Sequence, residues 1–166
     1  EEFDALGVPW EKRGARNDEY IEAMRALWQG PHAEYHGDFV DFEPATCSPR
    51  PVNGSIPIIV GGDSDAAISR AVRIADGYFP GEGDIAQLGA LLNRVRQAAE
   101  AAGRDPASIE FSAIFGSQMA NPEQGVEEMA SNGVDRIMVP AFFFGGPEGL
   151  DHLDQLSERI MPIANG

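Results

Sequence analysis

Two adjacent glycines form the sequence feature best suited to bind a ligand. Gly61 and Gly62 follow a short apolar run, residues 56–60, and Ser64 just after them is a favoured helix N-cap. Because glycine has no Cβ atom, a ligand can approach the main chain closely at such a point. The N–H groups at the start of the next helix would face the same point and attract an anion. The pattern predicts a phosphate site at Gly61 and Gly62, with a tight turn that only needs a flexible backbone as the alternative.

A third glycine, Gly81, follows the next apolar run, residues 77–80. Neighbouring parallel strands place their carboxyl ends side by side, and α/β proteins form their sites at that edge. We therefore expect Gly81 to offer one more amide to the anion that Gly61 and Gly62 bind.

The N-terminal part of the chain must hold a helix and a long connection. Residues 10–28 have helical periodicity, with Tyr20, Ile21 and Met24 on the apolar face and Glu19 on the polar face. This helix accounts for residues 1–30. Residues 31–55 then form a long insertion loop, in which 34–42 is expected to make a small hairpin that turns at Gly37-Asp38.

From residue 56 to residue 166 the sequence reads as four strand–helix units, which makes the chain a single domain. Strands that alternate with helices at this spacing indicate an α/β fold with a parallel sheet and flanking helices. Expected strands cover residues 56–60, 77–80, 109–115 and 136–140, and expected helices begin after Ser64 and at Ile85, Asn121 and Leu150.

Composition excludes several classes of function. Twelve Lys and Arg stand against 27 Asp and Glu, so the net charge is −15 and neither nucleic acid nor an anionic membrane is an expected partner. The single cysteine, Cys47, excludes an intrachain disulfide and favours a cytoplasmic location. His32, His36 and His152 lack metal-ligand spacing, so no metal site is predicted.

Other candidate residues have more than one reading. Arg13 and Arg16 either meet an anionic cofactor or pair with acidic neighbours such as Glu11 and Glu19. Arg50 either reaches a substrate or is a solvated loop residue. The Phe142-Phe143-Phe144 run either walls a pocket, covers the barrel floor or forms a subunit contact.

Several motifs resemble one known family in their order and spacing. The chain is similar to luciferase-like monooxygenases, and most similar to the subgroup that uses the deazaflavin coenzyme F(420). The motifs that carry the resemblance are residues 2–16 and 18–23, Tyr35-His36-Gly37, Pro49-Arg50-Pro51, residues 58–62 and residues 75–80.

The resemblance implies a fold and an activity. Members are (β/α)8 TIM barrels that transfer a hydride or activate oxygen on a small organic substrate, with FMN or coenzyme F(420) as cofactor. This chain would be the C-terminal half of such a barrel, with about four parallel strands. Gly61, Gly62 and Gly81 fall on the family positions that hold the cofactor phosphate. The units that carry most proposed proton donors precede the position of Glu1 in the family, so the catalytic residues stay unknown.

Half a barrel has consequences of its own. Eight strands close this fold, and four leave two open edges and an apolar inner face. We therefore expect a homodimer or a larger assembly formed through the open edges. Two alternatives to an oxidoreductase fragment remain, a non-catalytic half-barrel that self-associates and an unrelated phosphate-binding TIM-barrel enzyme.

Overall fold

Contacts within the chain divide it into two compact units, residues 1–58 and residues 59–166. The computed structural model describes residues 1–81 and 84–164. No helix among these residues is long and apolar enough to cross a membrane.

Unit 1 contains two helices and a two-stranded sheet. The predicted helix is present as α2, and the predicted hairpin is present as an antiparallel pair, with His36 opposite Asp41. The expected apolar face of α2 is only partly correct: Ile21 is buried, but the side chains of Tyr20 and Met24 are 44% and 38% exposed. The elements are α1 (Glu2–Ala5), α2 (Arg13–Gln29), β1 (Ala33–His36) and β2 (Asp41–Ala45).

Glu19 on α2 holds the turn of this hairpin. Its carboxylate accepts hydrogen bonds from the main-chain N–H groups of Asp38 (3.1 Å), Phe39 (2.6 Å) and Val40 (2.6 Å). A Cβ atom at Gly37 would overlap this carboxylate, so glycine is needed there for the close approach. The sequence placed Glu19 on the polar face of the helix, and in the structure the hairpin folds over that position.

Unit 2 alternates strands and helices as the sequence predicted. Its strands are β3 (Ile59–Gly61), β4 (Gly77–Phe79), β5 (Glu110–Ile114) and β6 (Arg136–Met138). Its helices are α3 (Asp65–Ile74), α4 (Ile85–Ala101), α5 (Pro122–Ser131) and α6 (Gly149–Ala164), with 3-10 turns η1 (Pro106–Ser108), η2 (Ser117–Ala120) and η3 (Ala141–Phe144).

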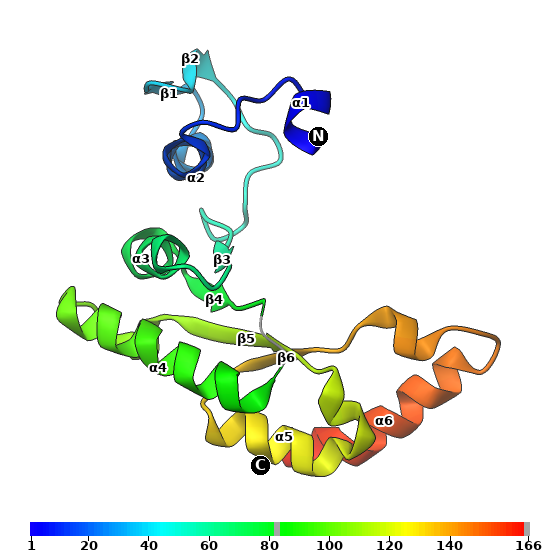
Figure 1. Cartoon of the computed structure of the whole chain (residues 1–166). Coiled ribbons are helices and arrows are strands. Elements are labelled where there is room, and N and C mark those ends of the chain that lie inside the picture. The colour runs from blue at the N-terminus through cyan, green and yellow to red at the C-terminus, as the bar shows by residue number, and fades with distance from the viewer. Residues whose placement is uncertain (82–83, 165–166) are drawn as a thin grey trace. The chain divides into compact units, whose positions relative to one another are not determined.

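The four strands form one parallel sheet in the order β3-β4-β5-β6, with β3 and β6 at its edges (Figure 1). This confirms the predicted α/β architecture. All four strands are shorter than expected, and proline explains the difference for two of them. Pro57 and Pro140 have no N–H group to offer a ladder, and β3 begins after the first while β6 ends before the second.

One face of the sheet packs against helices and the other does not. Val60, Tyr78 and Phe111 lie side by side in the strand register and are buried. Residues that alternate with them point to the opposite face, where Ile59 and Met138 are 41% and 51% exposed. Exposed apolar side chains on this face therefore lie on both edge strands.

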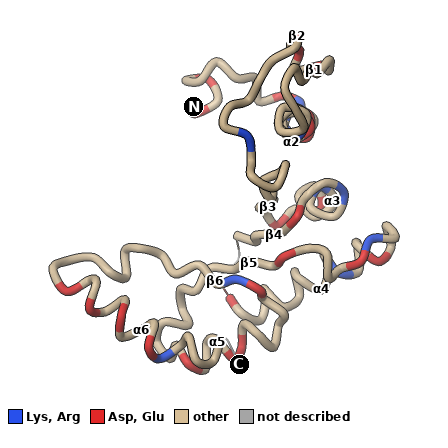
Figure 2. The backbone as a smooth tube through the Cα atoms, turned by 180° about the vertical axis from the view of Figure 1, so that it is seen from behind, with Lys and Arg blue, Asp and Glu red and all other residues tan. Residues whose placement is uncertain are grey.

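Acidic side chains dominate the charged surface of the chain, as its composition requires. Figure 2 shows Asp and Glu distributed over both units, with a row of them along α6.

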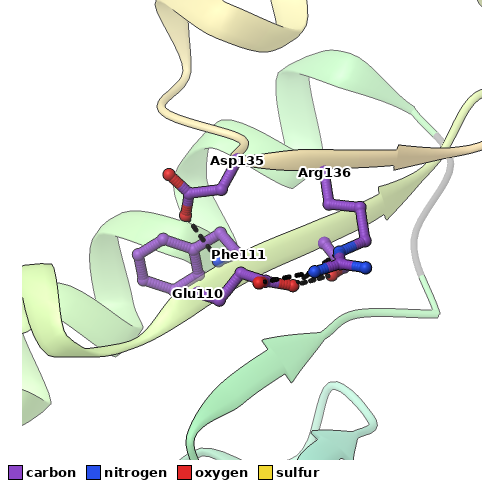
Figure 3. A network of polar contacts seen from close by, with 5 residues as sticks. Glu110, Phe111, Asp135 and Arg136 are labelled. Carbon is purple, nitrogen blue, oxygen red and sulfur yellow. Dashed lines mark hydrogen bonds and ion pairs between the residues drawn. The ribbon is translucent and has the colours of Figure 1, made fainter. Parts of the chain in front are cut away.

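A polar network ties the amino ends of β5 and β6 (Figure 3). The guanidinium of Arg136 donates to both carboxylate oxygens of Glu110, each at 2.8 Å, and this ion pair lowers the pKa of Glu110. Asp135 accepts from the Phe111 N–H at 2.7 Å and donates its own N–H to the Phe111 carbonyl at 2.8 Å. These contacts lie at the end of the sheet opposite the glycine-marked tips.

Arg104 binds the carboxyl end of α3. Its guanidinium donates to the carbonyl oxygens of Ala71 (3.2 Å), Val72 (2.9 Å) and Ala75 (2.7 Å). The last carbonyls of a helix lack partners within the helix, so a cation at this end satisfies them and opposes the negative end of the dipole.

We predict that Arg104→Ala lowers the free energy of unfolding by about 2 kcal/mol, because several buried carbonyls lose a charged donor. Urea unfolding measures the loss. Glu100→Ala, at an exposed position of α4, is the matched control and should change stability by less than about 0.5 kcal/mol. Equal effects of the two substitutions would contradict the assigned role.

We predict that Glu19→Ala destabilises unit 1 by about 2 kcal/mol, since three N–H groups of the hairpin turn lose one shared acceptor. Hydrogen exchange at Phe39 and Val40 should become faster while exchange in unit 2 is unchanged. Glu34→Ala, at an exposed position of β1, serves as the control. Unaltered exchange at the turn would count against the assignment.

Candidate functional site

The structure brings the predicted glycines together at the carboxyl ends of β3 and β4. Gly61 pairs with Phe79 across the parallel ladder, and the Gly62 N–H donates to the Phe79 carbonyl at 3.3 Å. Gly62 has a φ of +110°, a conformation that side chains other than glycine rarely adopt. A Cβ atom at Gly61 would lie 3.3 Å from the Phe79 carbonyl oxygen, so both positions favour glycine.

Asp63 links the two tips. Its carboxylate accepts a hydrogen bond of 2.9 Å from the Gly81 N–H, which belongs to the segment after β4. The amide of Gly81 therefore already binds an anionic oxygen, supplied by the chain itself. The expected convergence of Gly81 on the turn after β3 is present, but Gly62 and Gly81 both use their N–H groups within the chain.

The Tyr78 side chain holds the turn after β3 in place. Its side chain is fully buried, and its hydroxyl donates to the Gly62 carbonyl at 2.7 Å. Burial, with a smaller contribution from the negative charge of Asp63, raises the pKa of Tyr78 to about 12, while Arg94 acts in the opposite direction. The hydroxyl therefore stays protonated at neutral pH, and it positions the turn as a hydrogen-bond donor rather than as a base.

The start of α3 supplies further groups that suit an anion. Ser64 caps the helix as predicted, because its hydroxyl oxygen accepts from the Ala67 N–H at 3.2 Å. A hollow of about 270 Å³ adjoins the turn and is lined by Asp63, Gln87, Ala90, Leu91 and Arg94.

Charged side chains of both signs lie at this edge of the sheet. The guanidinium of Arg94 pairs with the Asp65 carboxylate at 2.5 Å, and Asp63 adds a second negative charge beside them. The donor set fits an anionic oxygen, since the Asp63 carboxylate takes that place on Gly81 in this structure. A cofactor phosphate would have to replace this carboxylate.

The other arginines singled out from the sequence lie in unit 1. Arg16 donates to the main-chain carbonyls of Pro9 (2.8 Å) and Glu11 (3.3 Å), and the Arg13 guanidinium lies 3.8 Å from the centre of the Trp10 ring. Glu19, one of the acidic partners expected for these arginines, binds the hairpin turn instead. Arg50 is exposed and lines a separate hollow of about 440 Å³ within unit 1.

The aromatic run after β6 is exposed rather than packed into a pocket. Phe142 and Phe143 are 77% and 36% exposed, and their ring centres are 4.6 Å apart. Cys47 donates weakly to the Pro49 carbonyl in unit 1. Within residues 1–81 and 84–164, no three His, Cys, Asp or Glu side chains gather as metal ligands.

Sequence reasoning missed the side chains that complete the site. Asp63 stands between the glycine pair and the Ser64 cap, and that position is a signal that could have marked it. Gln87 and Arg94 lie one helix further along the chain, and only the packing of α3 on α4 brings them to the turn.

The fold is that of a partial (β/α) barrel, and comparison with known proteins gives its family. A family model described as luciferase-like monooxygenase matches residues 1–160, so the chain belongs to this family. An uncharacterized protein of Mycobacterium tuberculosis is 39% identical over 140 residues, which are 84% of this chain and 46% of that protein. An FMNH(2)-dependent dimethylsulfone monooxygenase of Pseudomonas putida is 35% identical over 61% of this chain and 29% of its own length.

Solved structures confirm the fold. The coenzyme F(420)-dependent tetrahydromethanopterin reductase of Methanopyrus kandleri matches 96% of this chain and 70% of its own, with a TM-score of 0.71 at 16% identity. An F(420)-dependent secondary alcohol dehydrogenase matches 95% of this chain and 66% of its own, with a TM-score of 0.67 at 14% identity. The chain spans about half the length of the mycobacterial relative. Its four-stranded sheet with flanking helices is part of a luciferase-like TIM barrel.

We predict that Asp63→Asn strengthens the binding of inorganic phosphate at the turn about tenfold, because a like charge next to the Gly81 amide is removed. Chemical-shift titration of the Gly81 amide reports the binding. Asp151→Asn changes the net charge by the same amount on α6 and should leave the titration unaltered. A Gly81 amide that does not respond to phosphate in either variant would refute the anion site.

Proposed function

We propose that this chain supplies the phosphate end of the cofactor site in an FMN- or deazaflavin-dependent oxidoreductase that acts on a small organic substrate. The observation that carries the proposal is the hydrogen bond of 2.9 Å from Gly81 to the Asp63 carboxylate, because it marks an amide directed at an anionic oxygen. Membership of the luciferase-like family supports the class of reaction.

The residues at the β3 and β4 tips have separate tasks in this proposal. The Gly81 N–H binds the phosphate in place of the Asp63 carboxylate. Gly61 and Gly62 let the phosphate approach the main chain closely because they lack a Cβ atom, and the amino end of α3 adds its positive potential. Tyr78 keeps the turn in place through the Gly62 carbonyl. The bound cofactor supplies hydride transfer or oxygen activation, and no residue of this chain is assigned as a proton donor.

Two cofactors are compatible with this edge. The dimethylsulfone monooxygenase relative is named as FMNH(2)-dependent, whereas the two reductase and dehydrogenase structures are named as F(420)-dependent. The motifs in residues 2–23 favour the coenzyme F(420) subgroup, which is the cofactor we propose. Both cofactors carry a phosphate, so the same glycines serve either one. We further propose a cytoplasmic location, which the single Cys47 favours.

A non-catalytic half-barrel is the second candidate. The exposed side chains of Ile59 and Met138 on the open face favour it, since such a surface is suited to association rather than to solvent. It predicts no saturable binding of either cofactor.

We predict that the chain binds coenzyme F(420) saturably and that Gly62→Ala weakens this binding at least tenfold, because the φ of +110° at this position is strained for alanine. Fluorescence quenching of the deazaflavin measures the affinity, and a parallel titration with FMN compares the cofactors.

Gly103→Ala is the matched control, since Gly103 also has a positive φ, +73°, but lies after α4 with no neighbour near the added Cβ. Both variants should lose similar stability, and only Gly62→Ala should lose affinity. Absence of saturable binding in the unsubstituted chain would favour the half-barrel candidate.

A further inference from the structure

Arg94 on α4 lies where the candidate site meets the groove between α3 and α4. It lines the hollow beside the turn after β3 together with Asp63, and it also lines the larger hollow between the two helices. Its guanidinium donates to the Asp65 carboxylate at 2.5 Å. Two carboxylates, those of Asp63 and Asp65, are therefore neighbours of one cation.

The charges of Asp63 and Arg94 both act on the Tyr78 hydroxyl. Burial raises the pKa of Tyr78 most, the negative charge of Asp63 raises it further, and the positive charge of Arg94 lowers it. Because the interaction between charges weakens with distance, both side chains lie near this hydroxyl, which donates to the Gly62 carbonyl. Arg94 is therefore close enough to the turn to respond to a change of charge there.

An anion that binds the Gly81 amide deprives the Asp63 carboxylate of its donor. In the empty site this carboxylate accepts from the Gly81 N–H at 2.9 Å. Once displaced, it lies beside the incoming negative charge, and the two like charges repel one another. Rotation about the Cα–Cβ bond moves the carboxylate between staggered positions, and the hollow that it shares with Arg94 adjoins it.

The guanidinium of Arg94 is able to serve two carboxylates at once. A guanidinium has five N–H donors in a planar fork, and the contact with Asp65 uses the Nη2 nitrogen. The side chain of Arg94 is 50% exposed, so a small change in its direction meets little steric resistance. Arg94 can therefore bind Asp63 without releasing Asp65.

We infer that Arg94 is a positioning residue of the proposed cofactor site, which receives the Asp63 carboxylate when a phosphate takes its place on the Gly81 amide. The displaced charge is then neutralised by a cation, and the phosphate meets less repulsion. Arg94 acts through Asp63 and does not touch the phosphate. This inference rests on the proposed function.

A double-substitution cycle on the whole chain tests the inference, with inorganic phosphate as the ligand and chemical-shift titration of the Gly81 amide as the measurement. Arg94→Gln should weaken phosphate binding about threefold, which is the size of effect that an exposed ion pair has. Arg94→Lys keeps the charge and should restore most of the affinity. In the Asp63→Asn background, Arg94→Gln should have no measurable effect, because no displaced charge remains to be received.

Two controls separate this role from the loss of an ion pair or of a charge. Asp65→Asn breaks the pair between α3 and α4 but leaves the Arg94 cation for Asp63, so it should bind phosphate at least as tightly as the unsubstituted chain. Arg159→Gln on α6 removes the same charge as Arg94→Gln and should leave the phosphate affinity unaltered.

An equal loss from Arg94→Gln in both backgrounds would mean that Arg94 acts on the phosphate directly. An equal loss in Asp65→Asn would mean that Arg94 only joins α3 to α4. Either result overturns the inference and leaves the proposed function standing. A Gly81 amide that responds to phosphate neither in the unsubstituted chain nor in Asp63→Asn overturns the proposed function, and the inference with it.

Discussion

The parallel pairing of β3 with β4 is the constraint on which the candidate site depends. Its register places Gly61 opposite Phe79, and each later contact at the tips follows from that alignment. With β4 in place, the Tyr78 hydroxyl reaches the Gly62 carbonyl, and the segment after β4 brings Gly81 to Asp63. A slip of one residue would turn Tyr78 out of the core and separate these partners.

The same sheet explains why the two faces of unit 2 differ so strongly in character. Alternating residues from every strand point to the helices, where Tyr78 and Phe111 are buried. The positions between them point to the opposite side, which in a closed barrel is the interior. At the amino end of that side, Glu110 and Arg136 satisfy one another, so the charged pair does not depend on closure. The apolar side chains on the edge strands, Ile59 and Met138, stay exposed on this side of the sheet.

Local signals in the sequence were sufficient for the elements of unit 2. Ser64 and the proline after Asn121 mark the starts of α3 and α5 correctly, although the Asn121 side chain binds Gln124 rather than capping the helix main chain. The ends of the strands were predicted less accurately. A proline within an apolar run has no N–H group for the hydrogen-bond ladder, so the strand is shorter than the run. The glycines at the ends of β3 and β4 were recognisable, because glycine permits backbone conformations and close approaches that other residues do not.

Contacts between distant segments could not be predicted in this way. Glu19 lies about twenty residues before the hairpin turn that it holds, and periodicity placed it on the polar face of α2 without indicating a partner. Arg94 reaches Asp65 across 29 residues, and nothing in the pattern of α4 distinguishes it from other exposed arginines. Charge pairing of this kind depends on how helices pack, which is a property of the folded chain.

The carboxylate of Asp63 gives the turn an internal competitor for any external anion. A ligand that arrives at Gly81 must break an existing charge-assisted hydrogen bond before it forms its own, which reduces the net gain on binding. When the ligand leaves, the carboxylate can return and restore an ordered turn without waiting for solvent to fill the site. An anion that binds more weakly than this hydrogen bond therefore leaves the Asp63 carboxylate in its place.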